Sequence, residues 1–320
     1  MLILSDKDIE RIAQTDELVY AIERAYSLQD KASTNIPERL HLTNGPNTLL
    51  VMPGIINEVI GTKLVCVNPG NPKLGKPAIN GVMILQNITT GEPTAMLNGS
   101  KITAIRTGAV GATAVKYLAP LKSKCLGIIG SGIQAYYQAL MISEQRAFSK
   151  IVLFNRNKDK AVALKAKLSI KLKMISIEIA DNPEEVVRIA DVVVTTTSSK
   201  TPIFEINDVL IKQKTFIGIG SYKPEMQEIP LELFKNKGSV FVDTMHAAEE
   251  SGDLLIPIKK GILNPKDIIP FNTIISGKNT HLISSVNIFK SVGSSLFDLT
   301  VAEIIYNNAI ELGVGTTFDL

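Results

Sequence analysis

Residues 124–135 read Lys-Cys-Leu-Gly-Ile-Ile-Gly-Ser-Gly-Ile-Gln-Ala, an apolar run followed at once by closely spaced glycines. Residues 126–129 are typical of a short strand buried on both faces. Gly130 permits a tight turn, and Gly132 lets the backbone approach a pyrophosphate without a Cβ between them. The helix expected next turns its free N–H groups toward the phosphates. The context on both sides therefore favours a dinucleotide site over an ordinary glycine turn.

The composition sets the broad class of the protein. The 320 residues suffice for two ordinary domains, and 34 Lys and Arg nearly balance 31 Asp and Glu, for a net charge of +3. Without a dense basic run, nucleic acid and membrane surfaces are not expected as partners. No apolar stretch is long enough to cross a bilayer, and the first residues lack the basic start of a signal peptide. Cys66 and Cys125 lie in apolar runs and histidines number three, so we expect a cytoplasmic enzyme without a metal site.

After the glycine turn, the pattern alternates between strands and helices. Strands are predicted at 151–154, 175–180, 190–195, 215–220 and 239–243, with helices at 134–145, 158–171 and 183–189 between them. This order predicts an α/β fold with a Rossmann-type doubly wound sheet. Ligands of such sheets gather at the carboxyl ends of the strands. The positions concerned are Gly130, Asn155, Thr195, Thr196, Thr197, Gly220 and Asp243.

The first part of the chain has a different pattern of predicted helices and strands. Ser5 with Asp8 predicts the start of helices that run to about Lys31. Short strands are predicted at 48–52, 61–67, 81–86 and 93–97, and a helix rich in small residues at 100–118. A last helix begins near Ser294. We expect a discontinuous α+β domain of residues 1–118 and 300–320 around a dinucleotide-binding domain of residues 119–299.

The end of the second predicted strand bears on the choice of cofactor. Sheets that bind NAD usually carry Asp or Glu there, which binds the ribose 2′-hydroxyl and repels a 2′-phosphate. This chain has Asn155, Arg156, Asn157 and Lys158 instead. A basic side chain can neutralise a phosphate, although a solvated basic turn explains the same residues. We therefore predict NADPH, with NADH as the alternative.

Several basic side chains lack an obvious partner in the sequence. Arg106 stands among small and apolar residues with no acid three or four positions away, so it needs a distant acid or an anionic ligand. A guanidinium matches a carboxylate bidentately, yet a structural ion pair explains the residue equally well. Lys63 lies in a predicted strand, and Arg39 and His41 lie on one face of an extended segment. Taken singly, each of these is usually structural.

In order, these motifs resemble those of the ornithine cyclodeaminase and mu-crystallin family. The matching segments are Arg39-Leu-His41, Met52-Pro53, Gly61-Thr-Lys63, Ala104-Ile-Arg106-Thr107-Gly, the turn at 130–135, Asp243 with Glu250-Ser-Gly252-Asp253, and Gly293-Ser-Ser-Leu-Phe-Asp298-Leu. The resemblance spans nearly the whole chain. It implies an N-terminal domain for substrate binding and dimerisation, a nucleotide-binding domain and a homodimer.

The resemblance also implies roles for single residues. Arg39 and Arg106 would hold the substrate carboxylate, Lys63 would lie beside the reacting carbon or the carboxylate, and His41, Met52 and Gly293 would complete the substrate site. The residues implied for the dinucleotide are Thr107, Gly130, Ser131, Gly132, Ile133, Gln134, Asn155, Arg156, Asn157, Thr195, Thr196, Thr197, Gly220 and Val292.

One segment departs from the cyclodeaminase members of the family. They carry Gly-Asp-x-Pro-Gly-Lys-x-Glu-Leu, whose Asp handles protons, and here Tyr222 stands at the Asp position with Ser221 beside it. A phenol with a pKa of about 10 is a poor replacement for a carboxylate base. The segment is closer to the imine and ketimine reductases.

We therefore predict NAD(P)H-dependent reduction of a small cyclic 2-imino acid. The expected reaction converts Δ1-pyrroline-2-carboxylate to L-proline, or piperideine-2-carboxylate to pipecolate, as part of proline metabolism. Water, Ser221, Tyr222 or Lys63 would assist protonation of the imine. The alternatives are ornithine cyclodeamination, an activity like that of alanine dehydrogenase, and binding of NADPH without catalysis, as in mu-crystallin.

Overall fold

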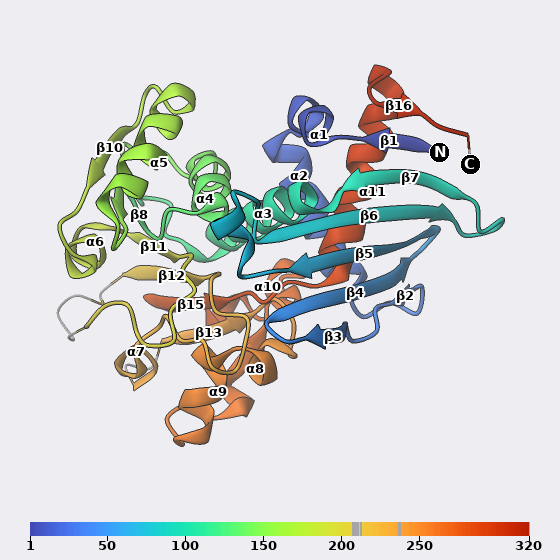
Figure 1. The fold of residues 1–320 in the computed structure, drawn as a ribbon. Helices are drawn as coiled ribbons and strands as arrows, with labels where there is room; N and C mark the ends of the chain where they lie inside the picture. Colours follow the sequence, from blue (N-terminus) through green and yellow to red (C-terminus); the bar gives the residue numbers. More distant parts are fainter. Residues whose placement is uncertain (207–210, 212, 236–237, 320) are drawn as a thin grey trace. The chain divides into compact units, whose positions relative to one another are not determined.

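A computed structural model describes residues 1–206, 211, 213–235 and 238–319 of the chain (Figure 1). The chain divides into two compact units. The first unit comprises Met1–Arg106 and Ser294–Leu320, and the second comprises Thr107–Gly293. The division at 106/107 lies inside a helix, twelve residues before the predicted boundary at 118 (118 − 106). Its second half belongs to the second unit because Gly108 packs against Tyr137 and Met141 of that unit.

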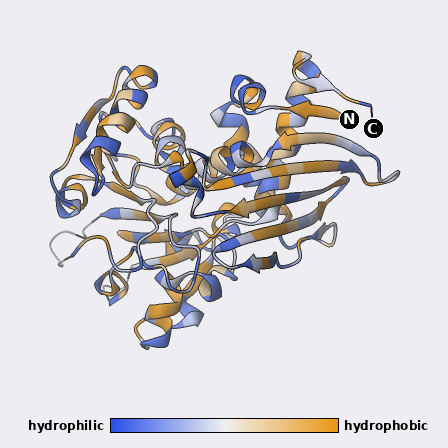
Figure 2. Cartoon of the chain, in the orientation of Figure 1, coloured by the Kyte–Doolittle hydropathy of each residue, from blue (hydrophilic) through white to orange (hydrophobic). Residues whose placement is uncertain are grey.

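The first unit contains an eight-stranded, mostly antiparallel sheet. Its order is β16-β1-β7-β6-β5-β4-β2, with β3 also paired to β4, and only the β1–β7 pair is parallel among its described pairs. The four strands predicted from the sequence are present, each longer than expected. The strands are β1 (Leu2–Leu4), β2 (Thr34–Asn35), β3 (Leu40–Asn44), β4 (Asn47–Ile56), β5 (Val59–Val67), β6 (Ile79–Asn87), β7 (Pro93–Asn98) and β16 (Thr316–Thr317). Figure 2 shows hydrophobic residues along much of β4, β5 and β6.

The helices of the first unit include three, at Asp6, Gly99 and Ser295, that begin within one residue of the predicted starts. The helices are α1 (Asp6–Ile12), α2 (Thr15–Leu28), the start of α3 (Gly99–Leu118), α11 (Ser295–Leu312) and the short 3-10 helix η1 (Asn71–Leu74). The side chain of Ser5 accepts a hydrogen bond from the backbone of Asp8, whose carboxylate bonds back to the backbone of Ser5. This reciprocal pair satisfies two N–H groups that the first helical turn leaves unpaired. The Ser5 signal is therefore confirmed.

Helix α11 packs directly on β4 and β5 of the same unit. Gly54 and Gly61 are paired across these strands, and a Cβ at either glycine would press on Leu299 of α11. The helix is also tied to β4 by a 3.0 Å hydrogen bond from the Ser295 hydroxyl to the carbonyl of Pro53. The glycine pair therefore sets how closely this helix approaches the sheet.

The second unit contains eight parallel strands in the order β10-β9-β8-β11-β12-β15-β13-β14. The predicted Rossmann-type sheet is confirmed, and so are its six predicted strands. Two strands were not predicted, β14 and β15, and β15 lies between β12 and β13. The strands are β8 (Cys125–Ile129), β9 (Lys150–Phe154), β10 (Ser176–Ile179), β11 (Val192–Thr195), β12 (Lys214–Gly218), β13 (Ser239–Val242), β14 (Ile268–Pro270) and β15 (Val286–Lys290).

Two helices of the second unit begin at asparagine caps. Asn157 caps α5 through the backbone N–H of Lys160, and Asn182 caps α6 through that of Glu185. Both helices have the predicted bounds. The helices are α4 (Ile133–Ser143), α5 (Lys158–Lys171), α6 (Pro183–Ile189), α7 (Leu231–Lys235), α8 (Ala247–Glu250), α9 (Gly252–Lys259), α10 (Asn272–Ile275), η2 (Pro265–Asp267) and η3 (Thr280–Leu282).

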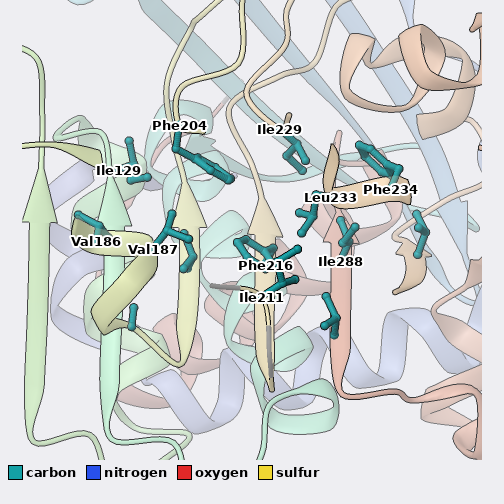
Figure 3. Close-up of a cluster of buried hydrophobic side chains, with 14 of the residues drawn as sticks. Ile129, Val186, Val187, Phe204, Ile211, Phe216, Ile229, Leu233, Phe234 and Ile288 are labelled. Carbon is teal, nitrogen blue, oxygen red and sulfur yellow. The ribbon is translucent and has the colours of Figure 1, made fainter. Parts of the chain in front are cut away.

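The core of the second unit lies against the central strands, where Phe204 stacks on Phe216 at 6.0 Å between ring centroids (Figure 3). Helix α6 packs so closely on β8 that a Cβ at Gly127 would lie 2.5 Å from a methyl group of Val186. Burial of each large apolar side chain contributes roughly 1.5–3 kcal/mol, which holds the strand ends of this sheet in place. Among the described residues, no helix is both long and apolar enough to span a membrane.

Candidate functional site

The glycine turn after β8 has the geometry of a dinucleotide site. Gly130 has φ +115°, a conformation that favours glycine, and it lies against Thr196. Gly132 precedes α4 in an extended conformation, and nothing lies within 4 Å of the place a Cβ would take. The hydroxyl of Ser131 and the side-chain carbonyl of Gln134 are buried without a hydrogen-bond partner among the described residues. Open space at Gly132, the Ser131 hydroxyl as a donor and the N-terminus of α4 fit a bound pyrophosphate, while the Gln134 carbonyl can accept a hydrogen bond from another part of the cofactor.

The predicted strand-end residues of the second unit lie at one edge of its sheet. Gly130, Asn155, Gly220 and Asp243 follow β8, β9, β12 and β13, and Thr195 ends β11. Because these strands are parallel, their carboxyl ends share one edge. Strand β8 lies between β9 and β11, so the strand order reverses there. A cofactor is expected at that reversal.

The basic turn after β9 has one side chain available to a phosphate. Asn155 donates a 2.9 Å hydrogen bond to the carbonyl of Asn157, and Asn157 caps α5. Arg156 is exposed, and no ion pair involves it in the described part of the chain. Lys158 lies 3.7 Å from Asp181, with both side chains in solvent. Of the predicted residues, Arg156 therefore best suits a 2′-phosphate.

The carboxylate of Glu228 ties together the ends of β11 and β12. It accepts hydrogen bonds from the Thr195 hydroxyl at 2.9 Å and from the backbone N–H groups of Thr197, Gly220 and Ser221 at 2.5, 2.7 and 3.1 Å. Burial raises the pKa of Glu228, while the positive charge of Lys290 opposes that rise. The predicted cofactor residues Thr195, Thr197 and Gly220 are thus fixed by an acid that the sequence analysis did not single out.

Glu228 belongs to a closed network around a buried lysine. Lys290 Nζ lies 3.0 Å from Asp253 Oδ2, and both side chains are fully buried. The other oxygen of Asp253 accepts the backbone N–H groups of Glu228 and Ile229 at 2.7 and 2.9 Å. We call Lys290, Asp253 and Glu228 the structural network. Its carboxylates bind Lys290, the Thr195 hydroxyl and backbone N–H groups.

Asp243 performs a similar task for the predicted residues Val292 and Gly293. Its Oδ2 accepts their backbone N–H groups at 3.0 and 2.7 Å and the Ser291 hydroxyl at 2.7 Å. Gly293 has φ +81°, so the turn requires a residue tolerant of that conformation. Thr107 is buried, and its carbonyl accepts a 2.7 Å hydrogen bond from Gln138.

Ser221 and Tyr222 differ in their availability for proton transfer. Ser221 is fully buried, and its hydroxyl bonds to the carbonyl of Met226 and to the hydroxyl of Ser251, each at 2.8 Å. These bonds favour a structural role for Ser221 over the predicted catalytic one. Burial, together with the charge of Glu225, raises the pKa of Tyr222. Its phenol therefore stays protonated at neutral pH and is able to donate a proton or hydrogen bond.

The first unit buries two cations against one carboxylate. Lys63 Nζ lies 2.5 Å from Asp298 Oδ2, and Arg106 Nε lies 3.0 Å from Asp298 Oδ1. Lys63 is on β5, Arg106 is on α3 and Asp298 is in the first turn of α11. We call these three residues the cation cluster. Two positive charges and one negative charge leave it a formal charge of +1.

Arg106 keeps donors available within this cluster. Its side chain is 8% exposed, and its only hydrogen bond to a described residue is the one from Nε. Nη1 and Nη2 therefore have no acceptor in the described part of the chain. Two parallel N–H donors of this kind match a carboxylate. Of the two interpretations left open by the sequence, both hold in part: Arg106 has a structural ion pair and also donors for a ligand.

Burial dominates the electrostatics of Lys63. It lowers the pKa of this lysine to about 8, and the charges of Arg106 and Arg39 act in the same direction, against the attraction of Asp298. Burial alone would raise the pKa of Asp298, but Lys63, Arg106 and Arg39 outweigh it, and the pKa falls below its ordinary value. The cluster therefore stays ionised at neutral pH and favours an anionic ligand.

The structure places the other predicted substrate residues of this unit around β4. Met52 is buried directly opposite Lys63 in the β4–β5 pair. Arg39 precedes β3 and is close enough to act on the charges of both Lys63 and Asp298. His41 is exposed on β3, where it pairs with Leu50. The described contacts thus join Lys63, Arg106 and Met52, with Arg39 nearby, and none joins His41 to the cluster.

Asp298 is the main site residue that sequence reasoning missed. It was recognised only as part of a motif, although an acid within the apolar run of a buried helix requires a partner as much as Arg106 does.

Within the described residues, no group of three His, Cys, Asp or Glu side chains is arranged to hold a metal ion. The two sets of residues can thus bind a small carboxylate and a dinucleotide.

Comparison with known proteins agrees with this chemistry. The sequence pattern of the ornithine cyclodeaminase/mu-crystallin family matches residues 1–313. A Δ1-pyrroline-2-carboxylate reductase of Bacillus cereus is 37% identical over 326 aligned positions, which cover 98% of each chain.

Two solved structures share the fold over nearly their full length. The Δ1-pyrroline-2-carboxylate reductase of Thermococcus litoralis, in complex with NADH and L-proline, has a TM-score of 0.93 and 30% identity, covering 99% of this chain and 100% of that one. An archaeal alanine dehydrogenase dimer with bound NAD has a TM-score of 0.91 and 29% identity, covering 100% of this chain and 99% of that one.

Proposed function

The chain belongs to the ornithine cyclodeaminase/mu-crystallin family, and from that premise we propose that it is an NAD(P)H-dependent imine reductase. Its substrate is a small cyclic 2-imino acid, in the first place Δ1-pyrroline-2-carboxylate, which is reduced to L-proline. The observation that carries this proposal is the cation cluster. Its charge of +1 and the terminal nitrogens of Arg106, which no described residue binds, suit one carboxylate.

The first task of the chain in this reaction is to hold the substrate. Arg106 binds the carboxylate through Nη1 and Nη2, while Arg39 adds positive charge. Lys63 gives one of its three N–H donors to Asp298 and keeps two for the carboxylate or the imine nitrogen. Fixing the carboxylate at these points fixes the position of C2, which lowers the entropic part of the barrier.

The second task is to support the charge change at the imine. When bound, the reduced nicotinamide supplies the hydride. A protonated imine nitrogen makes C2 more electrophilic, and Lys63, whose pKa is about 8, is mostly protonated at neutral pH. The Tyr222 hydroxyl and water are the other candidate donors. With Tyr222 in place of the cyclodeaminase Asp, net reduction is favoured over loss of ammonia.

The cofactor is held by the glycine turn and the strand ends of the second unit. Ser131 and Gln134 have unpaired polar atoms for it, and Gly132 leaves room beside the backbone. We favour NADPH over NADH because Arg156, and no acid, follows β9. The complexes of the two structural relatives contain NADH and NAD, so dual use is the alternative.

A homodimer is the expected assembly. The archaeal alanine dehydrogenase is described as a dimer, and this chain exposes apolar residues on a short edge strand. Leu40 and Leu42 of β3 are each 58% exposed. Such an edge is suited to a second copy of the chain. Cys66 and Cys125 are both free, which agrees with a reducing compartment such as the cytoplasm.

The alanine dehydrogenase relative makes reductive amination of pyruvate the second candidate, since it requires the same carboxylate site. The test is NADPH and NADH oxidation with pyrroline-2-carboxylate, piperideine-2-carboxylate, or pyruvate plus ammonia, beside an ammonia-release assay with ornithine. The proposal predicts the highest kcat/KM with a cyclic imine. If only ornithine, or only pyruvate plus ammonia, is turned over, the proposed imine reductase activity is wrong and the activity observed takes its place. If the cofactor binds but no substrate is turned over, the protein is a binding protein.

A further inference from the structure

We propose that Asp298 is a positioning residue for substrate binding: one carboxylate holds Lys63 and Arg106 together and leaves Nη1 and Nη2 of Arg106 to the substrate. This inference rests on the proposed function and extends it to a residue that need not touch the substrate. It concerns the imino-acid site alone, so it makes no claim about the cofactor.

The bonds of Asp298 divide its two oxygens between the two cations. Oδ2 accepts from Lys63 at 2.5 Å and Oδ1 from Arg106 Nε at 3.0 Å. The Nε atom is the only one of the three guanidinium nitrogens engaged by a described residue. A bond at Nε orients the plane of the guanidinium and keeps its two-nitrogen edge available. Asp298 thus uses the part of Arg106 that a substrate carboxylate does not need.

The fold fixes the position of the Asp298 carboxylate. Asp298 lies in the first turn of α11, where the helix N-terminus favours a negative charge. Its neighbour Leu299 packs over the Gly54–Gly61 pair, so the helix lies close to β5. Lys63 follows Gly61 by two residues and points to the same face of that strand. The glycine pair therefore brings the carboxylate within hydrogen-bond distance of Lys63.

The charge of Asp298 also keeps Lys63 in its cationic form. Burial lowers the pKa of Lys63 to about 8, and Arg106 from α3 and Arg39 from the segment before β3 add to that effect. Asp298, from α11, opposes it, while Met52 from β4 is apolar. Removing the carboxylate lowers the pKa of Lys63 further. The lysine would then lose its proton closer to neutral pH, and the site would lose an anion-binding charge.

The test compares Asp298→Asn with the unchanged protein by titration calorimetry. The ligand is pyrrole-2-carboxylate, a planar analogue whose ring nitrogen does not titrate near neutral pH, in the presence of saturating NADPH. We expect its Kd, and the KM for pyrroline-2-carboxylate, to rise at least about tenfold, because one carboxylate supports two charged donors. We also expect the alkaline loss of affinity to begin at lower pH, while the Kd of NADPH stays unchanged.

Two further variants separate positioning from a general effect on the fold. Glu303→Gln removes a carboxylate from the same helix, where it pairs with Arg24 at 2.6 Å, and it should leave the Kd of the analogue unchanged. Asp298→Glu keeps the charge but displaces the oxygens. It should therefore raise the Kd of the analogue without changing the pH at which its affinity begins to fall. It also serves as the test if Asp298→Asn does not fold.

The inference is overturned if folded Asp298→Asn, or Asp298→Glu in its place, binds the analogue as tightly as the unchanged protein. A parallel loss of NADPH affinity, or an equal loss in Glu303→Gln, would also overturn it, since either indicates a general structural effect. Failure of the proposed function is distinguishable. In that case the unchanged protein reduces no cyclic imine, whereas binding of the analogue still reports on Asp298.

Discussion

Both units of this chain bury a lysine against an aspartate, and the two pairs are used differently. In the structural network of the second unit, Asp253 binds Lys290 and two backbone N–H groups, and Glu228 accepts four further hydrogen bonds. One positive and two negative formal charges give it a charge of −1. In the cation cluster of the first unit, the Asp298 carboxylate binds two cations and no other described residue, and the formal charge is +1.

The difference lies in what remains unpaired. Burial of an ion pair is expensive, and the structural network offsets that cost because every oxygen of its two carboxylates accepts at least one hydrogen bond. The cation cluster retains two guanidinium nitrogens and a surplus positive charge, which an anionic ligand can satisfy. Buried Lys–Asp pairs therefore do not identify a binding site by themselves. A binding site is identified by the hydrogen-bond donors that remain unpaired and by the net charge.

Asp253→Asn should have the largest effect, and the effect should be on stability. Removing one charge from a buried pair leaves the other uncompensated and costs about 3–5 kcal/mol of unfolding free energy. For a unit of this size, that lowers Tm by roughly 6–20 °C. Thermal melts followed by circular dichroism measure it. An unchanged Tm would mean that the structural network is not a closed stabilising unit.

Arg106→Ala should reduce kcat/KM for the imino acid about a hundredfold, because the substrate carboxylate loses its bidentate donor. This corresponds to a loss of roughly 3 kcal/mol of transition-state stabilisation. Steady-state kinetics and NADPH binding measure the two parts separately, and NADPH binding should not change. Arg106→Lys is the matched control: it keeps the charge but not the fork, and most of the loss should persist. Full activity in Arg106→Lys would show that charge alone matters.

The pH dependence of ligand affinity should differ between the two units. Lys63 is protonated below its pKa of about 8 and loses its charge above it, so the affinity for pyrrole-2-carboxylate should fall as the pH rises through 8. The expected limiting slope is about tenfold per pH unit. NADPH affinity in the second unit, measured by fluorescence from about pH 7 to about pH 9, roughly one unit on either side of the transition, is the control. A flat profile for the analogue would remove Lys63 from the anion site.

Arg156→Ala should have the smallest effect, a loss of about 1 kcal/mol or roughly fivefold in affinity for NADPH, since the side chain is exposed. Affinity for NADH should not change, because it has no 2′-phosphate. Lys158→Ala, next to the same turn, is the comparison, as Lys158 already lies near Asp181. Equal losses for both cofactors would argue against a role in selecting NADPH.

Features encoded by neighbouring residues were predictable from the sequence. The bounds of α5 and α6 follow from Asn157 and from Asn182 with Pro183, which cap the helices locally. The glycine turn was likewise readable, because its strand, turn and helix are contiguous. Strand β15 was not predicted, since Asn287 and Lys290 interrupt its apolar pattern. Both are buried only because long-range partners, Leu118 and Asp253, satisfy them.

The site was predictable only in part, for the same reason. Arg106 was recognised as a buried cation in need of a partner, but that partner, Asp298, lies 192 residues later in the chain. The role of Glu228 was equally hidden, because its hydrogen bonds join the ends of two separate strands. The sequence identifies charged residues that are costly to bury. Only the tertiary structure shows whether the protein satisfies their hydrogen bonds or leaves donors for a ligand.

A crystal structure with NADPH and pyrrole-2-carboxylate bound would show whether the cation cluster holds the substrate carboxylate. We predict that the carboxylate accepts hydrogen bonds from Nη1 and Nη2 of Arg106 while Nε stays on Asp298, and that Lys290 remains paired with Asp253. A carboxylate bound elsewhere, with the terminal nitrogens of Arg106 taken by acceptors of the protein itself, would show that the cation cluster is structural and does not bind the substrate.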